Sequence, residues 1–169
     1  MGELSAARRW ASLTVLIGAV LLLAIDSTVL YLAVPALTED LDATATEVLW
    51  IGDIYSLAIA GLLVTMGNLA DRIGRKRLLL SGAGAFGLAS ALAAFAPTAG
   101  VLIAARLLLG IAGATLMPST LSLIRNIFPD QAERTRAIAI WSAASAAGIA
   151  IGPIVGGILL EHFWWGSVF

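Results

Sequence analysis

Long apolar stretches alternate with short polar segments along this chain. Five stretches contain the roughly 20 mainly apolar residues that a helix needs to cross a bilayer; they are residues 11–36, 48–69, 78–96, 101–124 and 137–160. A shorter apolar segment at 163–169 predicts the start of a sixth span. Because the connections are short, we expect helices that follow one another in sequence to lie side by side. The pattern predicts an all-α transmembrane bundle that forms one domain over residues 1–169.

The basic residues orient this bundle. Nine of the ten lysines and arginines lie outside the apolar stretches and on one side of them: Arg8, Arg9, Arg72, Arg75, Lys76, Arg77, Arg125, Arg134 and Arg136. The connection at residues 38–47, on the other side, has four acidic residues and no basic one. Because positively charged loops stay in the cytoplasm, we expect a cytoplasmic N-terminus. Tryptophans near the span ends fit an interfacial aromatic belt: Trp10, Trp50, Trp141, Trp164 and Trp165.

The composition agrees with a membrane protein and excludes several other classes. The chain is 60% hydrophobic and 12% charged, whereas soluble domains have about a quarter charged residues. It has no cysteine for a disulfide or thiolate site, and His162 is its single histidine, so we expect no metal site and no cofactor. The sequence contains no nucleophile–base pairing and no phosphate-binding loop, so we do not expect an enzyme. The expected partner is lipid rather than nucleic acid. The first apolar stretch is too long for a cleavable signal peptide.

Three ionisable residues fall inside the predicted spans: Asp26, Asp53 and Arg106. Charged groups at membrane depth are costly, and they commonly mark ion or substrate pathways. At the helical rise per residue, Asp26 is about 15 Å from the outer end of its span and the other two are roughly 8–10 Å from theirs. We expect the three to form a charged cluster facing a cavity if their spans converge.

Such a cluster has the chemistry needed to exchange a proton for an organic cation. A buried carboxylate can hold either a proton or an organic cation, and a nearby arginine tunes that balance. The alternatives are an Asp26–Arg106 pair that only orders the bundle, and an Asp53 that is simply hydrated near the interface. Tyr31, Trp50 and Tyr55 are candidates to line a substrate cavity by offering aromatic faces to a cation, although packing or an interfacial position explains each equally well.

The loop after the second stretch, GNLADRIGRKR over residues 67–77, is the sharpest local motif. Glycine permits close packing at Gly67 and a turn at Gly74, and Asp71 can pair with Arg75 or with a helix N-terminus. Charge alone fits a positive loop with one stray acid. The full spacing, however, resembles the cytoplasmic loop signature of the major facilitator superfamily. The resemblance implies a gating loop that latches two helical bundles, formed by Gly67, Asp71, Arg72, Gly74, Arg75 and Lys76.

Three further segments resemble the drug:proton antiporter branch of that superfamily, which has fourteen spans. AIDSTVLYLAVP at 24–35 resembles its first-span signature, with Tyr31 in place of the usual asparagine. LWIGDIYSL at 49–57 is similar to the second span of quaternary-ammonium and dye exporters. RLLLG at 106–110 resembles the fourth-span signature, with Leu109 replacing a glutamine. The resemblance implies proton or cation coupling by Asp26, Asp53 and Arg106.

The fifth stretch contains the pattern G-x-x-x-G-P-x-x-G-G at residues 148–157. Glycines four apart share one helix face and permit tight contact, while the proline removes a backbone hydrogen bond. A general packing motif explains the glycine spacing alone. The complete pattern resembles the antiporter signature of the same family, which is associated with export; its residues here are Gly148, Gly152, Pro153, Gly156 and Gly157.

Together these resemblances imply proton-coupled efflux of hydrophobic organic cations across a bacterial plasma membrane, driven by the proton gradient. Members of the family pair two bundles of six helices around the substrate site, so we expect this chain to be an N-terminal fragment that needs the C-terminal half of the same transporter. Two alternatives remain open. An uptake transporter for another small solute would have a basic or amide-rich cavity, and a non-transporting membrane scaffold would need no buried charges.

Overall fold

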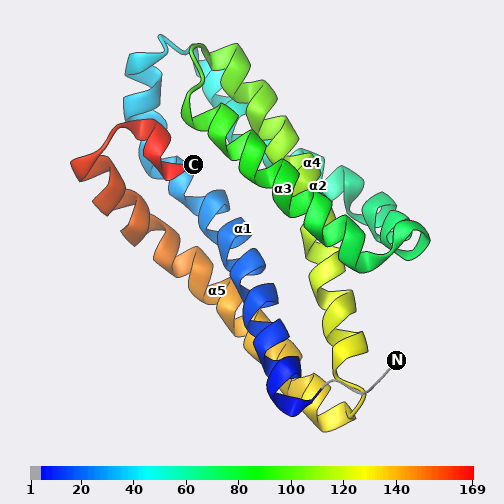
Figure 1. Cartoon of the computed structure of the whole chain (residues 1–169). Helices are drawn as coiled ribbons and strands as arrows, with labels where there is room; N and C mark the ends of the chain where they lie inside the picture. The colour runs from blue at the N-terminus through cyan, green and yellow to red at the C-terminus, as the bar shows by residue number, and fades with distance from the viewer. Residues whose placement is uncertain (1–4) are drawn as a thin grey trace.

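Five long helices make up most of residues 5–169, the part of the chain that the computed structural model describes (Figure 1). They are α1 (Ala6–Asp40), α2 (Ala45–Ile73), α3 (Arg75–Ala94), α4 (Ala99–Ile127) and α5 (Gln131–His162). Each is long and apolar enough to cross a membrane, and no strand occurs within residues 5–169. The predicted all-α transmembrane fold is confirmed.

Every helix begins before the predicted span, because helical structure continues into the polar residues that flank the membrane. Side chains cap three of these starts. The Thr44 hydroxyl accepts from the Glu47 amide at 3.3 Å, and the Glu47 carboxylate accepts from the Thr44 amide at 2.9 Å. This capping box satisfies amides that otherwise lack partners in the first turn of α2. Thr98 and Asp130 cap α4 and α5 in a simpler way.

The helices form two groups rather than a sequential ring (Figure 1). One group is α1 packed along α5, and the other is α4 packed between α2 and α3. Contacts between α1 and α2, or between α4 and α5, are much fewer. The expectation that helices adjacent in sequence lie side by side is therefore wrong for most pairs. Short loops hold the helix ends together, but complementary small-residue faces decide which helices pack closely along their length.

The α1–α5 interface depends on one row of glycines. A β-carbon added at Gly148 would lie 2.7 Å from Ala24 Cβ, and one added at Gly156 would lie 2.6 Å from Val29 Cγ2. Gly152 lies between them, and a β-carbon added there would approach the Thr28 hydroxyl oxygen more closely still. The prediction that these glycines share a tightly packed face is confirmed.

The remaining two members of the predicted antiporter signature, Pro153 and Gly157, lie elsewhere on α5. Pro153 is exposed, and a β-carbon added at Gly157 would have no neighbour within 4 Å. These two residues thus face away from α1.

A close approach of the same kind joins α4 to α2. A β-carbon added at Gly110 would lie 2.6 Å from the Tyr55 carbonyl oxygen and 2.7 Å from Ala58 Cβ. Since lipid tails are as apolar as side chains, such backbone proximity supplies the van der Waals contact that holds membrane helices together. It also fixes Tyr55 against α4.

Residues 163–169, where the sequence predicts the start of a sixth span, contain a single turn of 3₁₀ helix, η1 (Trp165–Val168). The turn folds back onto the bundle. Trp165 Nε1 donates to Asp40 Oδ2 at 2.6 Å, and the Ser90 hydroxyl donates to the Phe169 carbonyl oxygen. These bonds attach η1 and the residue that follows it to both α1 and α3, one helix from each group.

The glycine row generates a stability prediction with an internal control. We expect Gly148→Val to lower the free energy of unfolding by about 2 kcal/mol relative to Gly157→Val, because only the first introduces a side chain into a filled interface. The two variants share the same change in helix propensity. Thermal or denaturant unfolding of the purified protein measures the difference, and equal stability of the two variants would show that the α1–α5 contact does not require glycine.

Candidate functional site

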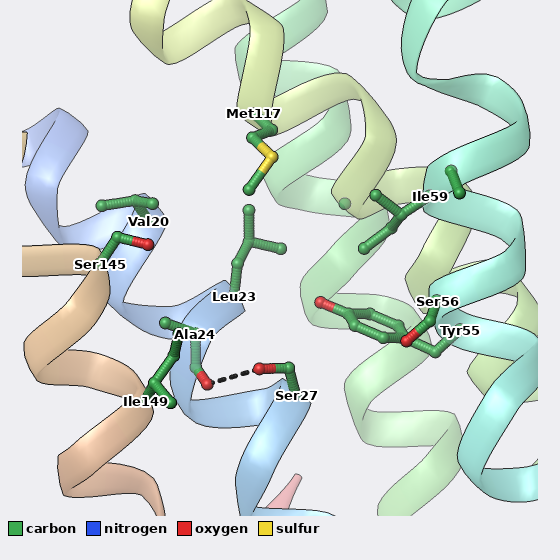
Figure 2. Close-up of a pocket in the computed structure, with 12 residues that line it drawn as sticks. Val20, Leu23, Ala24, Ser27, Tyr55, Ser56, Ile59, Met117, Ser145 and Ile149 are labelled. Carbon is green, nitrogen blue, oxygen red and sulfur yellow. Dashed lines mark hydrogen bonds between the residues drawn. The ribbon is translucent and has the colours of Figure 1, made fainter. Parts of the chain in front are cut away.

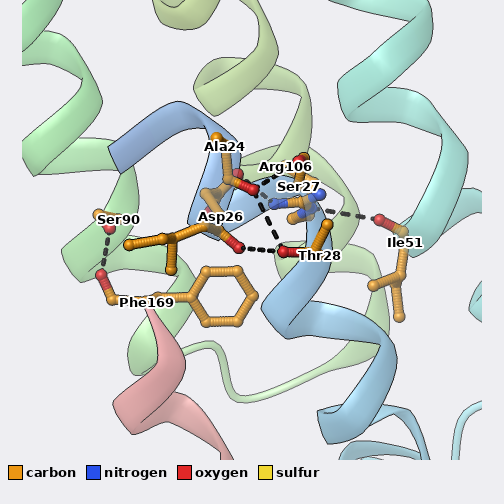
Figure 3. A network of polar contacts seen from close by, with 9 residues as sticks. Ala24, Asp26, Ser27, Thr28, Ile51, Ser90, Arg106 and Phe169 are labelled. Atoms are coloured by element: carbon orange, nitrogen blue, oxygen red, sulfur yellow. Dashed lines mark hydrogen bonds and ion pairs between the residues drawn. The ribbon is translucent and has the colours of Figure 1, made fainter. Parts of the chain in front are cut away.

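A buried ion pair joins the two helix groups (Figure 3). Arg106 Nη1, on α4, lies 2.9 Å from Asp26 Oδ2, on α1. Asp26 is 7% exposed and Arg106 is 1% exposed. Arg106 Nε also donates to the Ile51 carbonyl oxygen of α2, at 3.3 Å. Among the described residues, no other ion pair connects the α1–α5 group to the α2–α3–α4 group.

Aromatic rings surround the guanidinium of Arg106. Its Cζ lies 4.4 Å from the centre of the Tyr55 ring and 5.8 Å from that of the Phe169 ring. A desolvated cation over an aromatic face gains electrostatic stabilisation from the ring quadrupole. The arginine is therefore held by a carboxylate, a carbonyl and two rings, which compensate for its removal from water.

The orientation of Asp26 follows from the packing of α1. Ala24 and Thr28, four residues apart, face the glycines of α5. Asp26 lies midway between them in sequence and is turned roughly 200° from each, so it points away from α5 and toward α4. The glycine row of α5 and the ion pair thus use opposite faces of one turn of α1.

Asp53 does not join this pair. It is exposed, and the described residues provide it with no hydrogen bond or ion pair. The three spans do converge as expected, but α2 contributes the Ile51 carbonyl and the Tyr55 ring. Asp53 lies two residues from each of these and so projects from the other side of the helix. The predicted three-member charged cluster is wrong in this respect.

A pocket of about 250 Å³ lies between the two helix groups (Figure 2). Its wall is mainly apolar, with hydroxyl groups from three serines and one tyrosine, and no charged residue from the described part of the chain lines it. The lining residues are Val20, Leu23, Ala24, Ser27, Tyr55, Ser56, Ile59, Ala60, Gly113, Met117, Ser145 and Ile149. Four of the five helices contribute to it, so the pocket depends on how the two groups meet.

The three aromatic candidates have different positions. Tyr55 is 2% exposed and lines the pocket, whereas Tyr31 is 65% exposed and Trp50 is 48% exposed, and neither of the latter lines it. One face of the Tyr55 ring is already covered by Arg106, at 4.4 Å. Within this bundle, the cation that this face of Tyr55 meets is therefore the internal arginine.

Sequence reasoning missed the serines and Met117 that line the pocket. Ser27, Ser56 and Ser145 are hydroxyl residues within apolar stretches, and that was the available signal. Serine in a span also bonds to its own helix, as Ser27 does by donating to the Ala24 carbonyl oxygen at 2.7 Å. A serine within an apolar stretch therefore does not by itself identify a pocket residue, because the packing of the helices must also be known.

The loop between α2 and α3 forms a separate cluster at the predicted cytoplasmic end. Arg75 Nη2 lies 2.9 Å from Asp71 Oδ1, so the predicted pairing with Arg75 occurs. Gly74 alone separates the two helices and has φ +98°, a left-handed conformation that favours glycine. Arg72 and Lys76 are exposed. A β-carbon added at Gly67 would only just touch Pro118, at 4.0 Å, so α2 and α4 remain close here.

Comparison with known proteins places this architecture. The sequence profile described as Major Facilitator Superfamily matches residues 16–169. The chain is 61% identical over 162 residues to the multidrug efflux pump LfrA of Mycolicibacterium smegmatis, 51% identical to the methyl viologen resistance protein SmvA of Salmonella typhimurium, and 47% identical to a methylenomycin A resistance protein of Streptomyces coelicolor. These alignments cover 96%, 96% and 86% of this chain, but only 32%, 33% and 30% of the relatives. The chain thus spans about a third of their length.

The buried pair predicts a stability difference between two carboxylates. We expect Asp26→Asn to lower the free energy of unfolding by about 3 kcal/mol, because it leaves the Arg106 charge buried without a counterion. Asp53→Asn removes an exposed carboxylate and is expected to change it by less than about 0.5 kcal/mol. Unfolding of the purified variants measures both values.

A double variant separates the lost charge balance from other effects. Adding Arg106→Gln to Asp26→Asn is expected to recover part of the lost stability, because the unpaired charge is gone. Simple additivity of the two substitutions would contradict the pairing.

Proposed function

Because this chain belongs to the Major Facilitator Superfamily, we propose that it forms the N-terminal part of a longer transporter that exports lipophilic organic cations in exchange for protons. The relatives named for multidrug efflux and for resistance to methyl viologen and methylenomycin A support the drug-export part of this proposal. The proposed location is a bacterial plasma membrane, with the N-terminus in the cytoplasm as the basic residues predict.

The observation that carries the proposal is the buried Asp26–Arg106 pair at the junction of the two helix groups. A proton added to Asp26 removes the negative charge that Arg106 faces, and this weakens the one ion pair that residues 5–169 form between the groups. A change in their relative position is then easier. Proton binding and helix movement are in this way linked through a single contact.

The remaining site residues take supporting roles in this scheme. The exposed Asp53 offers a carboxylate that can attract a cation at the edge of α2. Asp71 and Arg75 form a local pair beside the turn at Gly74, which suits the latch role that the family resemblance implies. The glycines of α5 let α1 and α5 move as one unit.

The pocket weighs against uptake of an anion or a sugar-like solute. Such a substrate would need basic or amide side chains, and the residues lining the pocket include neither. A passive scaffold would not need a buried ion pair, and charges at membrane depth are costly. A largely apolar substrate therefore fits this pocket better, and the relatives named for efflux and resistance favour export over uptake.

The test is ethidium efflux, with simultaneous measurement of proton movement, by the complete transporter reconstituted in vesicles. We expect Asp26→Asn to reduce proton-driven efflux at least about 100-fold, because the variant has no carboxylate to hold the proton. Asp53→Asn should lower efflux less, by weakening cation attraction. Glu161→Gln, which removes an exposed carboxylate at the end of α5, is the matched control and should transport normally.

Two outcomes would reject this assignment. Efflux and proton coupling that survive Asp26→Asn unchanged would exclude Asp26 as the proton site. Loss of transport in Glu161→Gln to the same degree as in Asp26→Asn would show that the assay responds to carboxylate removal in general.

A further inference from the structure

Tyr55 lies between the ion pair and the pocket and contacts both. The face of its ring covers the Arg106 guanidinium, with 4.4 Å from Cζ to the ring centre. The same side chain lines the pocket together with Leu23, Ser27 and Ile59 (Figure 2). Its main chain is fixed as well, because Gly110 of α4 allows the Tyr55 carbonyl to approach closely. Any shift of this ring therefore changes its contact with the Arg106 guanidinium.

The hydroxyl of Tyr55 differs from the other polar groups of the pocket. It is buried and lies near the Asp26 carboxylate, but no residue in the described part of the chain is placed to form a well-aligned hydrogen bond with it. Buried hydroxyls normally have a partner. Figure 2 shows the hydroxyl extending from α2 toward α1, across the space between the helix groups. By contrast, Ser27 uses its hydroxyl within its own helix.

The other residues of the pocket indicate which kind of ligand would bind beside this hydroxyl. Apolar side chains, including Leu23, Met117 and Ile149, supply most of the wall, and within residues 5–169 no charged side chain lines it. A volume of about 250 Å³ accommodates part of a drug-sized molecule. The matching chemistry is an apolar ring or chain that carries one hydrogen-bond acceptor, such as a carbonyl oxygen.

We propose that Tyr55 is a specificity-determining and positioning residue: its hydroxyl, which has no well-aligned hydrogen bond within the described residues, donates one to a carbonyl-type acceptor on a substrate in the pocket, while its ring holds Arg106 against Asp26. This inference rests on the proposed function and adds a substrate class to it. Among lipophilic cations, those that carry a carbonyl acceptor are bound in preference to those that carry none. The substrate also engages the side chain that supports the ion pair.

Two probe cations of the same charge separate the hydroxyl from the ring. Rhodamine 6G carries an ester carbonyl, whereas tetraphenylphosphonium has no acceptor. In the complete transporter, Tyr55→Phe is expected to raise KM for rhodamine 6G about fivefold, the effect of one neutral hydrogen bond. KM for tetraphenylphosphonium and both maximal rates should stay within about twofold, because phenylalanine keeps the ring over Arg106.

Tyr55→Leu tests the ring. Leucine removes the aromatic face from the guanidinium, so we expect proton-driven transport of both probes to fall at least about tenfold. Tyr55→Phe should retain transport of tetraphenylphosphonium, as rescue by the conservative variant. Tyr31→Phe is the matched control for loss of a phenol hydroxyl, and it should leave the ratio of the two KM values unchanged, since Tyr31 is exposed and outside the pocket.

The outcomes distinguish this inference from the proposed function. Equal changes of KM for both probes in Tyr55→Phe, or no change for either, would overturn the inference, as would tetraphenylphosphonium transport that survives Tyr55→Leu at the level of Tyr55→Phe. Those results leave export itself intact. A wild-type transporter that carries neither probe would refute both the proposed function and the inference that rests on it.

Discussion

The contact between Asp26 and Arg106 constrains the rest of this bundle. Two charges at membrane depth are tolerated only when each satisfies the other, because lipid offers no water to either. The helices that carry them must therefore meet at this depth, whatever the rest of their surfaces prefer. Arg106 has further partners in the Ile51 carbonyl and the Tyr55 ring, both on α2. Positions on α1, α2 and α4 are thereby fixed by one guanidinium.

Small residues determine the remaining contacts. The glycine row of α5 joins it to α1, and Gly110 joins α4 to α2. Backbones that approach this closely are held by many weak contacts and resist separation, whereas the boundary between the two groups has fewer contacts and contains the ion pair and the pocket. The molecule thus combines two firmly packed units with a thinner junction. The titratable group lies at that junction, where a change in charge has the greatest effect on helix arrangement.

Much of this architecture could be predicted from the sequence, for physical reasons that also explain the failures. Apolar length gives the spans, and a charge inside a span is rare enough to single out Asp26 and Arg106. Glycines four apart indicate one face of α5. Helix facing is harder, because a span is apolar on all sides and lacks the amphipathic pattern that orients a soluble helix. For that reason the direction of Asp53, the packing partners of each helix and the covered face of Tyr55 emerged only from the structure.

The intact pair also has an electrical consequence. Asp26 and Arg106 together carry no net charge, so a transmembrane voltage does almost no work on them when the helices move. Protonation of Asp26 would leave the arginine unbalanced, and a unit charge crossing the whole membrane changes energy by about 2.3 kcal/mol per 100 mV. The voltage of an energised cell would therefore act on the proton-loaded bundle and leave the unprotonated one largely unaffected. A neutral pair of this kind lets one protonation event turn sensitivity to the membrane potential on and off.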